Sequence, residues 1–367
     1  PTASATRMAT LARLPALSGT PHLVLTTVSA VMQYVPPRDL VAARVFHARP
    51  GQDLDTEALV GFLTANGYSR CSTVMEPGDF AVRGGIIDLF PPGDAMPVRL
   101  DMFGQTLESI RSFDPETQRS QEQRVEVFLF PAGEIHLNSD AVSRFRRGYV
   151  SAFGAVTDND PLYEAISAGS RYQGMEHWLP LFYEKLETAF DHFGDCAYFT
   201  DAQSGNAYQE RADQVRDYYE ARCDALDDPS SGASKIKPLP PEKLYLVDDV
   251  WQAIGDRFTW ISLDGYKLPD AQAVDLGARI GRNFAAERGM EGVNVFDSFL
   301  THLAALRTAK KRVLLVCWSA GARDRMKSVL EEHGATDIRI ASTWSDVASL
   351  PSGVCAISDF GLEEGFE

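Results

Sequence analysis

Apolar and polar residues alternate most regularly in the segment 98–103, which predicts a β-strand with one buried face. The apolar positions, expected to face a core, are Val98, Leu100 and Met102. The other positions, expected to face outward, are Arg99, Asp101 and Phe103. An outward aromatic ring beside an outward arginine indicates a binding surface, because both residue types are enriched at protein interfaces.

The preceding segment 79–90 is also rich in strand-forming residues, and we expect it to present a second arginine, Arg83. Gly84 and Gly85 interrupt it, which indicates a bulge or the close approach of another backbone. The Pro-Pro-Gly sequence at 91–93 ends the pattern, because proline lacks the main-chain donor that a strand needs.

Helical and strand-like patterns alternate along the rest of the chain, which predicts an α/β protein. A helix expected at 56–66, capped by Asp53 or Asp55, joins the strands above in a small α+β module. Outside this module, strands are expected at 22–26, 196–201, 244–247 and 258–261. Helices are expected at 7–17, 140–153, 161–168 and 208–225.

The last part of the chain, from about residue 276, predicts a separate domain. A helix is expected to begin at Asn294 or Asp297, and strand and helix patterns alternate from there to residue 357, as in a small parallel α/β domain. The segment 227–241 contains four prolines, three serines and a glycine, which predicts a loop.

Composition excludes several classes of protein. The length of 367 residues suits two or three domains, and the net charge of −16 disfavours a nucleic acid as the main partner. No apolar run approaches the roughly 18 residues of a membrane span. The five cysteines are scattered without a CxxC pair, which favours free thiols in a reducing cytoplasm and disfavours a zinc site. We therefore expect a cytoplasmic protein without a metal or cofactor.

The main question about activity is whether the chain hydrolyses a nucleotide. No stretch reads GxxxxGK[ST], the glycine-rich loop that cradles nucleotide phosphates. Because the chain starts with Pro1 rather than methionine, we expect it to be a piece of a longer protein.

Several stretches resemble one family of repair proteins. The segment 79–93 resembles the protein-binding module shared by the excision-repair helicase UvrB and the bacterial transcription-repair coupling factors. The segments 109–119, 174–182 and 361–366 resemble the coupling factors more closely. These separated motifs appear in the family's order, and the resemblance covers essentially the whole chain, which is similar to the N-terminal UvrB-homology region of the coupling factors and the small α/β domain that follows it.

The resemblance implies a domain organisation. Residues 1–44 and 131–275 would form a degenerate RecA-like, or helicase-like, α/β domain whose N-terminal part precedes this chain. Residues 45–130 would form an inserted α+β module that binds UvrA. Residues 276–367 would form the small C-terminal α/β domain.

The resemblance also implies that the helicase-like domain is inactive. Asp201 matches the magnesium-binding acid of the second motor motif, but the glutamate that would activate water is replaced by Ala202. A methyl group cannot orient or deprotonate a nucleophile. The alternative, a fragment of a UvrB-type ATP-dependent DNA helicase, is disfavoured by Ala202. A simpler role for Asp201 is that of a helix cap or a loop carboxylate.

Arg83, Arg99 and Phe103 match positions with which the family's module grips UvrA. The residues alone leave another interpretation open, in which Arg99 pairs with Asp101 or Glu108 and Phe103 is a stray exposed ring. The resemblance implies a non-catalytic adaptor that recruits UvrA to stalled RNA polymerase for nucleotide excision repair. RNA polymerase and double-stranded DNA would be bound by domains absent here, and the module would also contact the translocase domains within the full-length protein.

Overall fold

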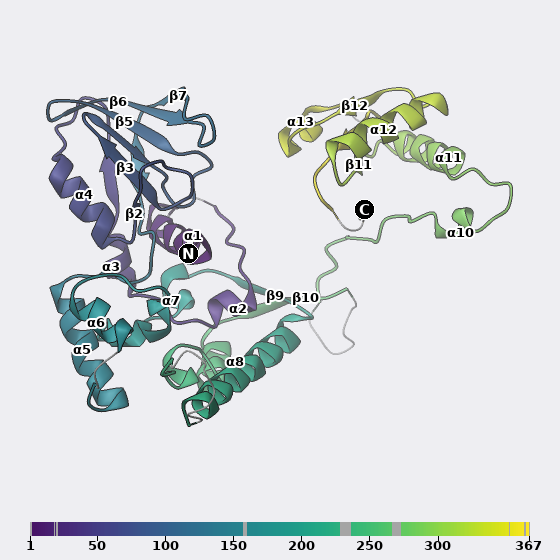
Figure 1. Cartoon of the computed structure of the whole chain (residues 1–367). Helices are drawn as coiled ribbons and strands as arrows, with labels where there is room; N and C mark the ends of the chain where they lie inside the picture. The colour runs from purple at the N-terminus through teal and green to yellow at the C-terminus, as the bar shows by residue number, and fades with distance from the viewer. Residues whose placement is uncertain are drawn as a thin grey trace. The chain divides into compact units, whose positions relative to one another are not determined.

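The computed structural model divides into two compact units, residues 1–264 and residues 265–367 (Figure 1). It describes residues 2–17, 19, 21–156, 160–227, 236–265, 273–351, 353–362 and 365–366. The expected loop at 227–241 therefore lies largely outside the described residues. The domain boundaries expected at 44/45, 130/131 and 275/276 stay predictions.

A six-stranded sheet dominates the part of the first unit between residues 69 and 124. Its strands are ordered β2-β3-β4-β5-β6-β7, and neighbours are antiparallel except β2 and β3. The strands are β2 (Ser69–Arg70), β3 (Asp79–Arg83), β4 (Ile86–Leu89), β5 (Val98–Phe103), β6 (Thr106–Phe113) and β7 (Ser120–Arg124). The strand expected at 98–103 is thus confirmed as β5.

One face of this sheet is buried against helix α4 (Thr56–Ala65) and the two-stranded sheet of β1 (Phe46–Ala48) and β8 (Val127–Leu129). Helix α4 contributes Leu59 and Leu63, and its N-cap is Asp55, whose carboxylate accepts main-chain hydrogen bonds. The sheet contributes Phe80, Ile87, Leu89, Val98, Leu100, Leu107 and Ile110. Because side chains alternate along a strand, the opposite face carries the polar residues, together with Ala81 and Phe113 of a small buried apolar cluster.

The remaining helices of the first unit enclose three further apolar clusters. They are α1 (Thr2–Arg13), α2 (Val28–Val31), α3 (Arg38–Ala42), α5 (Ser139–Phe153), α6 (Pro161–Ser167), α7 (Ala189–Phe193), α8 (Ser204–Asp227) and α9 (Asp249–Arg257). Short 3-10 helices lie at Leu14–Leu17, Met175–Leu181 and Pro241–Lys243, and the second of them is kinked at Trp178.

Arg44 ties together the two connections between the sheet module and the rest of the first unit. Only 7% of this residue is exposed. Its Nε donates to Asn66 Oδ1 at 2.7 Å, Nη1 to the Glu134 carbonyl at 3.3 Å and Nη2 to the Gly133 carbonyl at 3.0 Å. The incoming chain, the end of α4 and the outgoing chain are therefore joined by one buried guanidinium.

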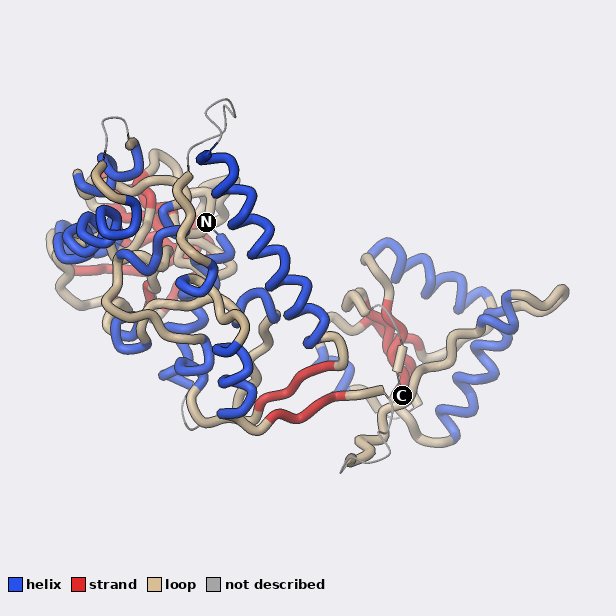
Figure 2. Tube along the Cα trace, turned by 90° about the horizontal axis from the view of Figure 1, so that it is seen from below, coloured by secondary structure: helices blue, strands red, loops and turns tan. Residues whose placement is uncertain are grey.

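Another two-stranded sheet of the first unit lies next to the long helix α8. Strands β9 (Tyr198–Asp201) and β10 (Trp260–Leu263) are parallel, and Figure 2 shows them side by side. Tyr198 and Trp260 face an aromatic cluster, whereas Phe199 is 52% exposed. The expectation of a buried strand at 196–201 is thus correct for one face only.

Two strands expected from the sequence are wrong. The segment 22–26 has strand-forming composition, but Leu23 and Leu25 are exposed and it pairs with no strand among the described residues. The segment 244–247 also forms no strand, and its contribution is an isolated bridge between Tyr245 and Gln33. A strand needs a hydrogen-bonding neighbour, which composition alone does not guarantee.

The second unit contains a three-stranded parallel sheet ordered β11-β13-β12. Its elements are α10 (Ala285–Arg288), α11 (Val295–Thr308), β11 (Val313–Val316), α12 (Ala320–Glu332), β12 (Ile338–Ile340), α13 (Trp344–Ser349) and β13 (Cys355–Ser358). Of the two residues expected to start α11, Asn294 and Asp297, Asn294 is its N-cap. The parallel α/β pattern expected here is confirmed. Across the described ranges, no helix has the length and apolar character to span a bilayer.

Candidate functional site

The candidate site lies where two hairpin turns meet at one end of the six-stranded sheet. Strands β3 and β4 are joined by Gly84 and Gly85, and Arg83 pairs with Ile86 across that turn. Ile86 pairs in turn with Asp101 on β5. The outer face at this end therefore carries Arg83, Ile86 and Asp101 in a row across three neighbouring strands.

Arg83 is exposed, as the sequence predicted. Its Nη2 donates to the Ser72 carbonyl and lies 3.5 Å from the Thr73 hydroxyl oxygen. No carboxylate pairs with it in the ion pairs of the described residues. A guanidinium has five N–H donors, so most of the donors of Arg83 are available to a partner.

Arg99 is less exposed than the sequence predicted, because Asp88 holds it. The Arg99 Nε donates to Asp88 Oδ1 at 2.7 Å and its Nη2 to Asp88 Oδ2 at 3.0 Å, a two-point ion pair. The Asp88 side chain is 3% exposed and that of Arg99 18%. The hydrogen bond with Asp88, opposed by partial burial, raises the pKa of Arg99. The alternative interpretation, in which Arg99 pairs with Asp101 or Glu108, is therefore wrong, because the ion-pair partner is Asp88.

Further contacts fix the Arg99 guanidinium against the sheet. Its Cζ lies 5.0 Å from the centre of the Phe113 ring. Its Nη1 donates to the Ser120 hydroxyl at 3.3 Å and to the Gln118 carbonyl at 3.4 Å. The planar fork that would grip a partner's carboxylate is thus already occupied by Asp88.

Phe103 is the most exposed aromatic residue of this face, with 80% of its surface accessible. It ends β5 just before the turn at Gly104, which has a φ of +64°. The Met102 amide donates to the Gly85 carbonyl at 2.7 Å, so the β3–β4 turn lies directly beside the end of β5. The structure thus brings Arg83 and Phe103 to the same end of the sheet.

A second ion pair neutralises the neighbouring charges. The Arg111 Nη2 lies 3.1 Å from Asp101 Oδ2, and the Ser109 hydroxyl donates to the same oxygen at 2.6 Å. Since Asp88 is matched by Arg99 and Asp101 by Arg111, Arg83 is the cation of this end of the sheet that faces solvent without an acidic partner in the described structure.

Ile86 and Asp88 belong to this site, although sequence reasoning did not single them out. Ile86 is 37% exposed beside Arg83, whereas Asp88 is 2% exposed. Both lie in the segment 86–90, whose other residues are all apolar and resemble core. Their spacing in the sequence could have revealed this, because residues two apart in a strand share a face, and Ile86 and Asp88 lie on the same face as Arg83.

Asp201 and Ala202 lie far from this site in the sequence, at the end of β9. Asp201 Oδ1 accepts hydrogen bonds from the Gln203 amide at 3.0 Å and the Ser204 hydroxyl at 2.8 Å. The Ser204 hydrogen bond is the main cause that lowers the pKa of Asp201. This carboxylate therefore organises the turn into α8, which is the simpler of the two roles that the sequence allowed.

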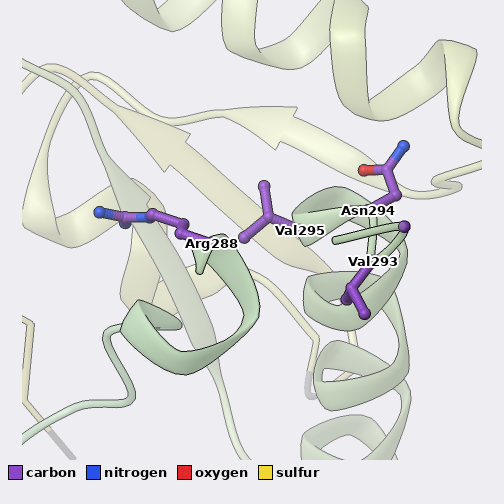
Figure 3. Close-up of a pocket in the computed structure, with 5 residues that line it drawn as sticks. Arg288, Val293, Asn294 and Val295 are labelled. Atoms are coloured by element: carbon purple, nitrogen blue, oxygen red, sulfur yellow. The ribbon is translucent and has the colours of Figure 1, made fainter. Parts of the chain in front are cut away.

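A shallow hollow at the start of α11 offers no comparable chemistry. It is lined by Arg288, Gly292, Val293, Asn294 and Val295. Figure 3 shows the polar ends of Arg288 and Asn294 pointing away from each other, with Val295 between them. The described residues also contain no group of three or more metal-binding side chains. The sheet end at Arg83 and Phe103 therefore remains the candidate site.

Comparison with known proteins connects this sheet to a defined family. A family model described as the UvrB interaction domain matches residues 46–134. The transcription-repair-coupling factor of Rickettsia bellii is 30% identical over 333 residues, or 89% of this chain and 28% of that protein. Those of Haemophilus influenzae and Escherichia coli are 34% and 31% identical over 62% and 68% of this chain.

The chain spans 20%, 21% and 28% of the lengths of these three relatives. The UvrB interaction domain holds β1 to β8 together with α4, the elements that position Arg83, Asp88, Arg99 and Phe103. The matched domain and the relatives, which cover most of the chain, show that it belongs to the transcription-repair-coupling factor family and corresponds to the UvrB-homologous region of such a protein.

Proposed function

We propose that this chain is a non-catalytic adaptor that recruits UvrA, so that nucleotide excision repair is delivered to stalled RNA polymerase. The observation that carries the proposal is the exposed end of the sheet, with Arg83 and Phe103, inside a UvrB interaction domain. A protruding aromatic ring beside an unpaired arginine is typical of a protein-binding hot spot. The net charge of −16 supports a protein partner over a nucleic acid.

Arg83, Arg99 and Phe103 together form the proposed UvrA site, with different roles. Phe103 enters an apolar depression on the partner, and Arg83 donates to a carboxylate at its edge. Arg99 acts mainly through Asp88: their ion pair keeps the outer face of β4 and β5 flat and electrically neutral. Its Nη1 makes only longer hydrogen bonds, of 3.3 and 3.4 Å, so this is the nitrogen of Arg99 that can most easily exchange a partner for UvrA.

We further propose that residues 1–44 and 131–275 are a degenerate helicase-like domain, with residues 45–130 inserted and residues 276–367 separate. The parallel pairing of β9 and β10 supports this assignment, because parallel strands are typical of such α/β domains. Ala202 beside Asp201 supports the absence of ATP hydrolysis. Binding of RNA polymerase and DNA, and an internal contact with the translocase domains, belong to the full-length protein, which acts in the cytoplasm without a cofactor bound to this region.

Titration calorimetry with purified UvrA tests the adaptor role. The wild-type chain should bind, and Arg83→Ala and Phe103→Ala should each weaken binding by about tenfold or more. Arg147→Ala is the matched control, since Arg147 is also exposed and has no ion pair among the described residues. Failure of the wild-type chain to bind UvrA would refute the proposal.

A further inference from the structure

We infer that Ile86 is an additional partner-binding residue, which forms with Phe103 an apolar ridge that enters the partner surface. This inference rests on the proposed UvrA-recruiting function. Ile86 lies on the outer face of β4 and is 37% exposed, although Ile87 beside it is 1% exposed in the core. More than a third of this large aliphatic residue is therefore exposed at a position where a polar residue would suit a solvated sheet face.

Strand register places Ile86 next to Phe103. Ile86 pairs with Asp101, and Phe103 follows two residues later on the same face of β5. Diagonal neighbours of this kind lie about 7–8 Å apart at the backbone, which an aromatic ring can span. The register shift between Asp101 and Met102 leaves Met102 paired with the buried Leu107, so the ring of Phe103 stays on the outer face.

The charges around the ridge define the partner's chemistry. Asp88 and Asp101 are matched by Arg99 and Arg111, so the surroundings of Ile86 are close to neutral. Arg83, directly across from Ile86, is the cation left for the partner. The structure therefore fits an apolar depression with a carboxylate at the rim that faces Arg83.

Glycine makes the close arrangement of the two turns possible. A Cβ on Gly85 would lie 2.9 Å from the Met102 carbonyl oxygen, a separation that real Cβ atoms essentially never show. Without a side chain at Gly85, β4 starts close enough to β5 for Ile86 and Phe103 to form one continuous surface.

The test compares Ile86→Thr with Ile261→Thr by calorimetry against UvrA. Threonine keeps the β-branch that a strand favours but removes apolar surface. Ile261 is the matched control, because it also lies in a strand of the first unit and is 42% exposed. We expect Ile86→Thr to weaken UvrA binding by about tenfold with an unchanged melting temperature, and Ile261→Thr to bind as the wild type does.

Two further variants keep the inference falsifiable. Ile86→Leu, which stays apolar, should retain affinity within about threefold. Ile86→Thr should matter less in a Phe103→Ala background, because residues of one ridge couple. Wild-type affinity of Ile86→Thr, with Phe103→Ala still impaired, would overturn the inference and leave the adaptor role intact. Loss of affinity in Ile261→Thr as well would also overturn it, whereas absent binding by the wild-type chain would refute the adaptor role itself.

Discussion

The carbonyl oxygen of Gly85 accepts a hydrogen bond from the Met102 amide at 2.7 Å, and this contact fastens the turn after β3 to the end of β5. Two hairpins that are formed by different parts of the sequence are thereby held as one surface. The geometry of that surface depends on the absence of a side chain at residue 85.

Replacing Gly85 with alanine should lower the free energy of unfolding by about 1–3 kcal/mol, because the new methyl group meets a backbone oxygen that cannot move alone. Gly61→Ala is the control: this glycine lies within α4 with open space around it, and the substitution should raise stability by about 0.5–1 kcal/mol. Chemical denaturation measures both. Equal stability of the two variants would show that the turns are not closely packed.

Arg99→Ala should destabilise the chain by about 3 kcal/mol, because it leaves the buried carboxylate of Asp88 without its ion-pair partner. Arg111→Ala removes a more exposed pair with Asp101 and should cost less than about 1 kcal/mol. Thermal denaturation distinguishes the two. A loss of UvrA binding in Arg99→Ala is therefore evidence for a direct contact only if the variant is folded under the conditions of the binding experiment.

Stability should fall as the pH is lowered from about 7.5 to 5.5. Burial lowers the pKa of His192 and of His136 below the usual value of 6.5. A lowered pKa means that the unfolded chain takes up the proton first, so stability is full above pH 6.5 and is lost towards the folded-state pKa. Each histidine contributes at most about 1.4 kcal/mol per pH unit.

His192 offers a direct check of that pH dependence. Its Nε2 lies 2.9 Å from the Pro36 carbonyl, and its Nδ1 is buried without a hydrogen-bond partner in the described structure. A proton on Nδ1 would therefore be a buried, unsatisfied donor. His192→Gln keeps a donor for Pro36 but does not titrate, so it should flatten the pH profile. If the pH dependence of stability is the same in His192→Gln as in the wild type, residues other than His192 cause it.

The purified chain should not hydrolyse ATP, with or without DNA, because Ala202 cannot activate water and no phosphate-binding loop is present in the sequence. Asp201→Ala should only lower the melting temperature slightly, through loss of the hydrogen bonds from Gln203 and Ser204. A coupled phosphate-release assay measures turnover. ATPase activity that co-purifies with the chain and disappears in Asp201→Ala would contradict the adaptor role.

Limited trypsin digestion should separate the two units. Arg279 and Arg282 lie in a described stretch, 273–283, that contains no helix and no strand apart from a single bridge at Ile280, and their side chains are 63% and 46% exposed. Cleavage there should release a folded C-terminal piece of about 85 residues, an ordinary size for a small domain. Mass spectrometry identifies the fragments, and a resistant chain of full length would argue against two independent units.

The sequence predicted those parts of the fold that depend on the pattern of neighbouring residues alone. Strand β5 follows from its alternation, because a sheet with one buried face requires a period of two. The cap of α11 follows from Asn294, since a side-chain acceptor satisfies main-chain donors wherever a helix starts. The segment 22–26 has equally good strand composition, yet the partner that would make it a strand cannot be read from its own residues.

The candidate site shows the same limit. The exposure of Arg83 and Phe103 followed from the pattern, because both occupy outer-face positions that no other described residue covers. The partner of Arg99 did not, since Asp88 lies inside an apolar run, eleven residues earlier, and becomes adjacent only through the register of β4 and β5. The register between two strands determines which charged residues face each other. That register cannot be read from the residues of one strand alone.

Arg44 has a mechanical consequence for the sheet module that carries the candidate site. The sheet module is attached to the rest of the first unit by an incoming and an outgoing connection. Arg44 lies on the incoming one, and its guanidinium donates to the Gly133 and Glu134 carbonyls on the outgoing one and to Asn66 at the end of α4. A pulling force applied at Phe103 is therefore shared between the two connections instead of straining one. The two connections of the module are therefore tied to each other by side-chain hydrogen bonds and do not depend on main-chain links alone.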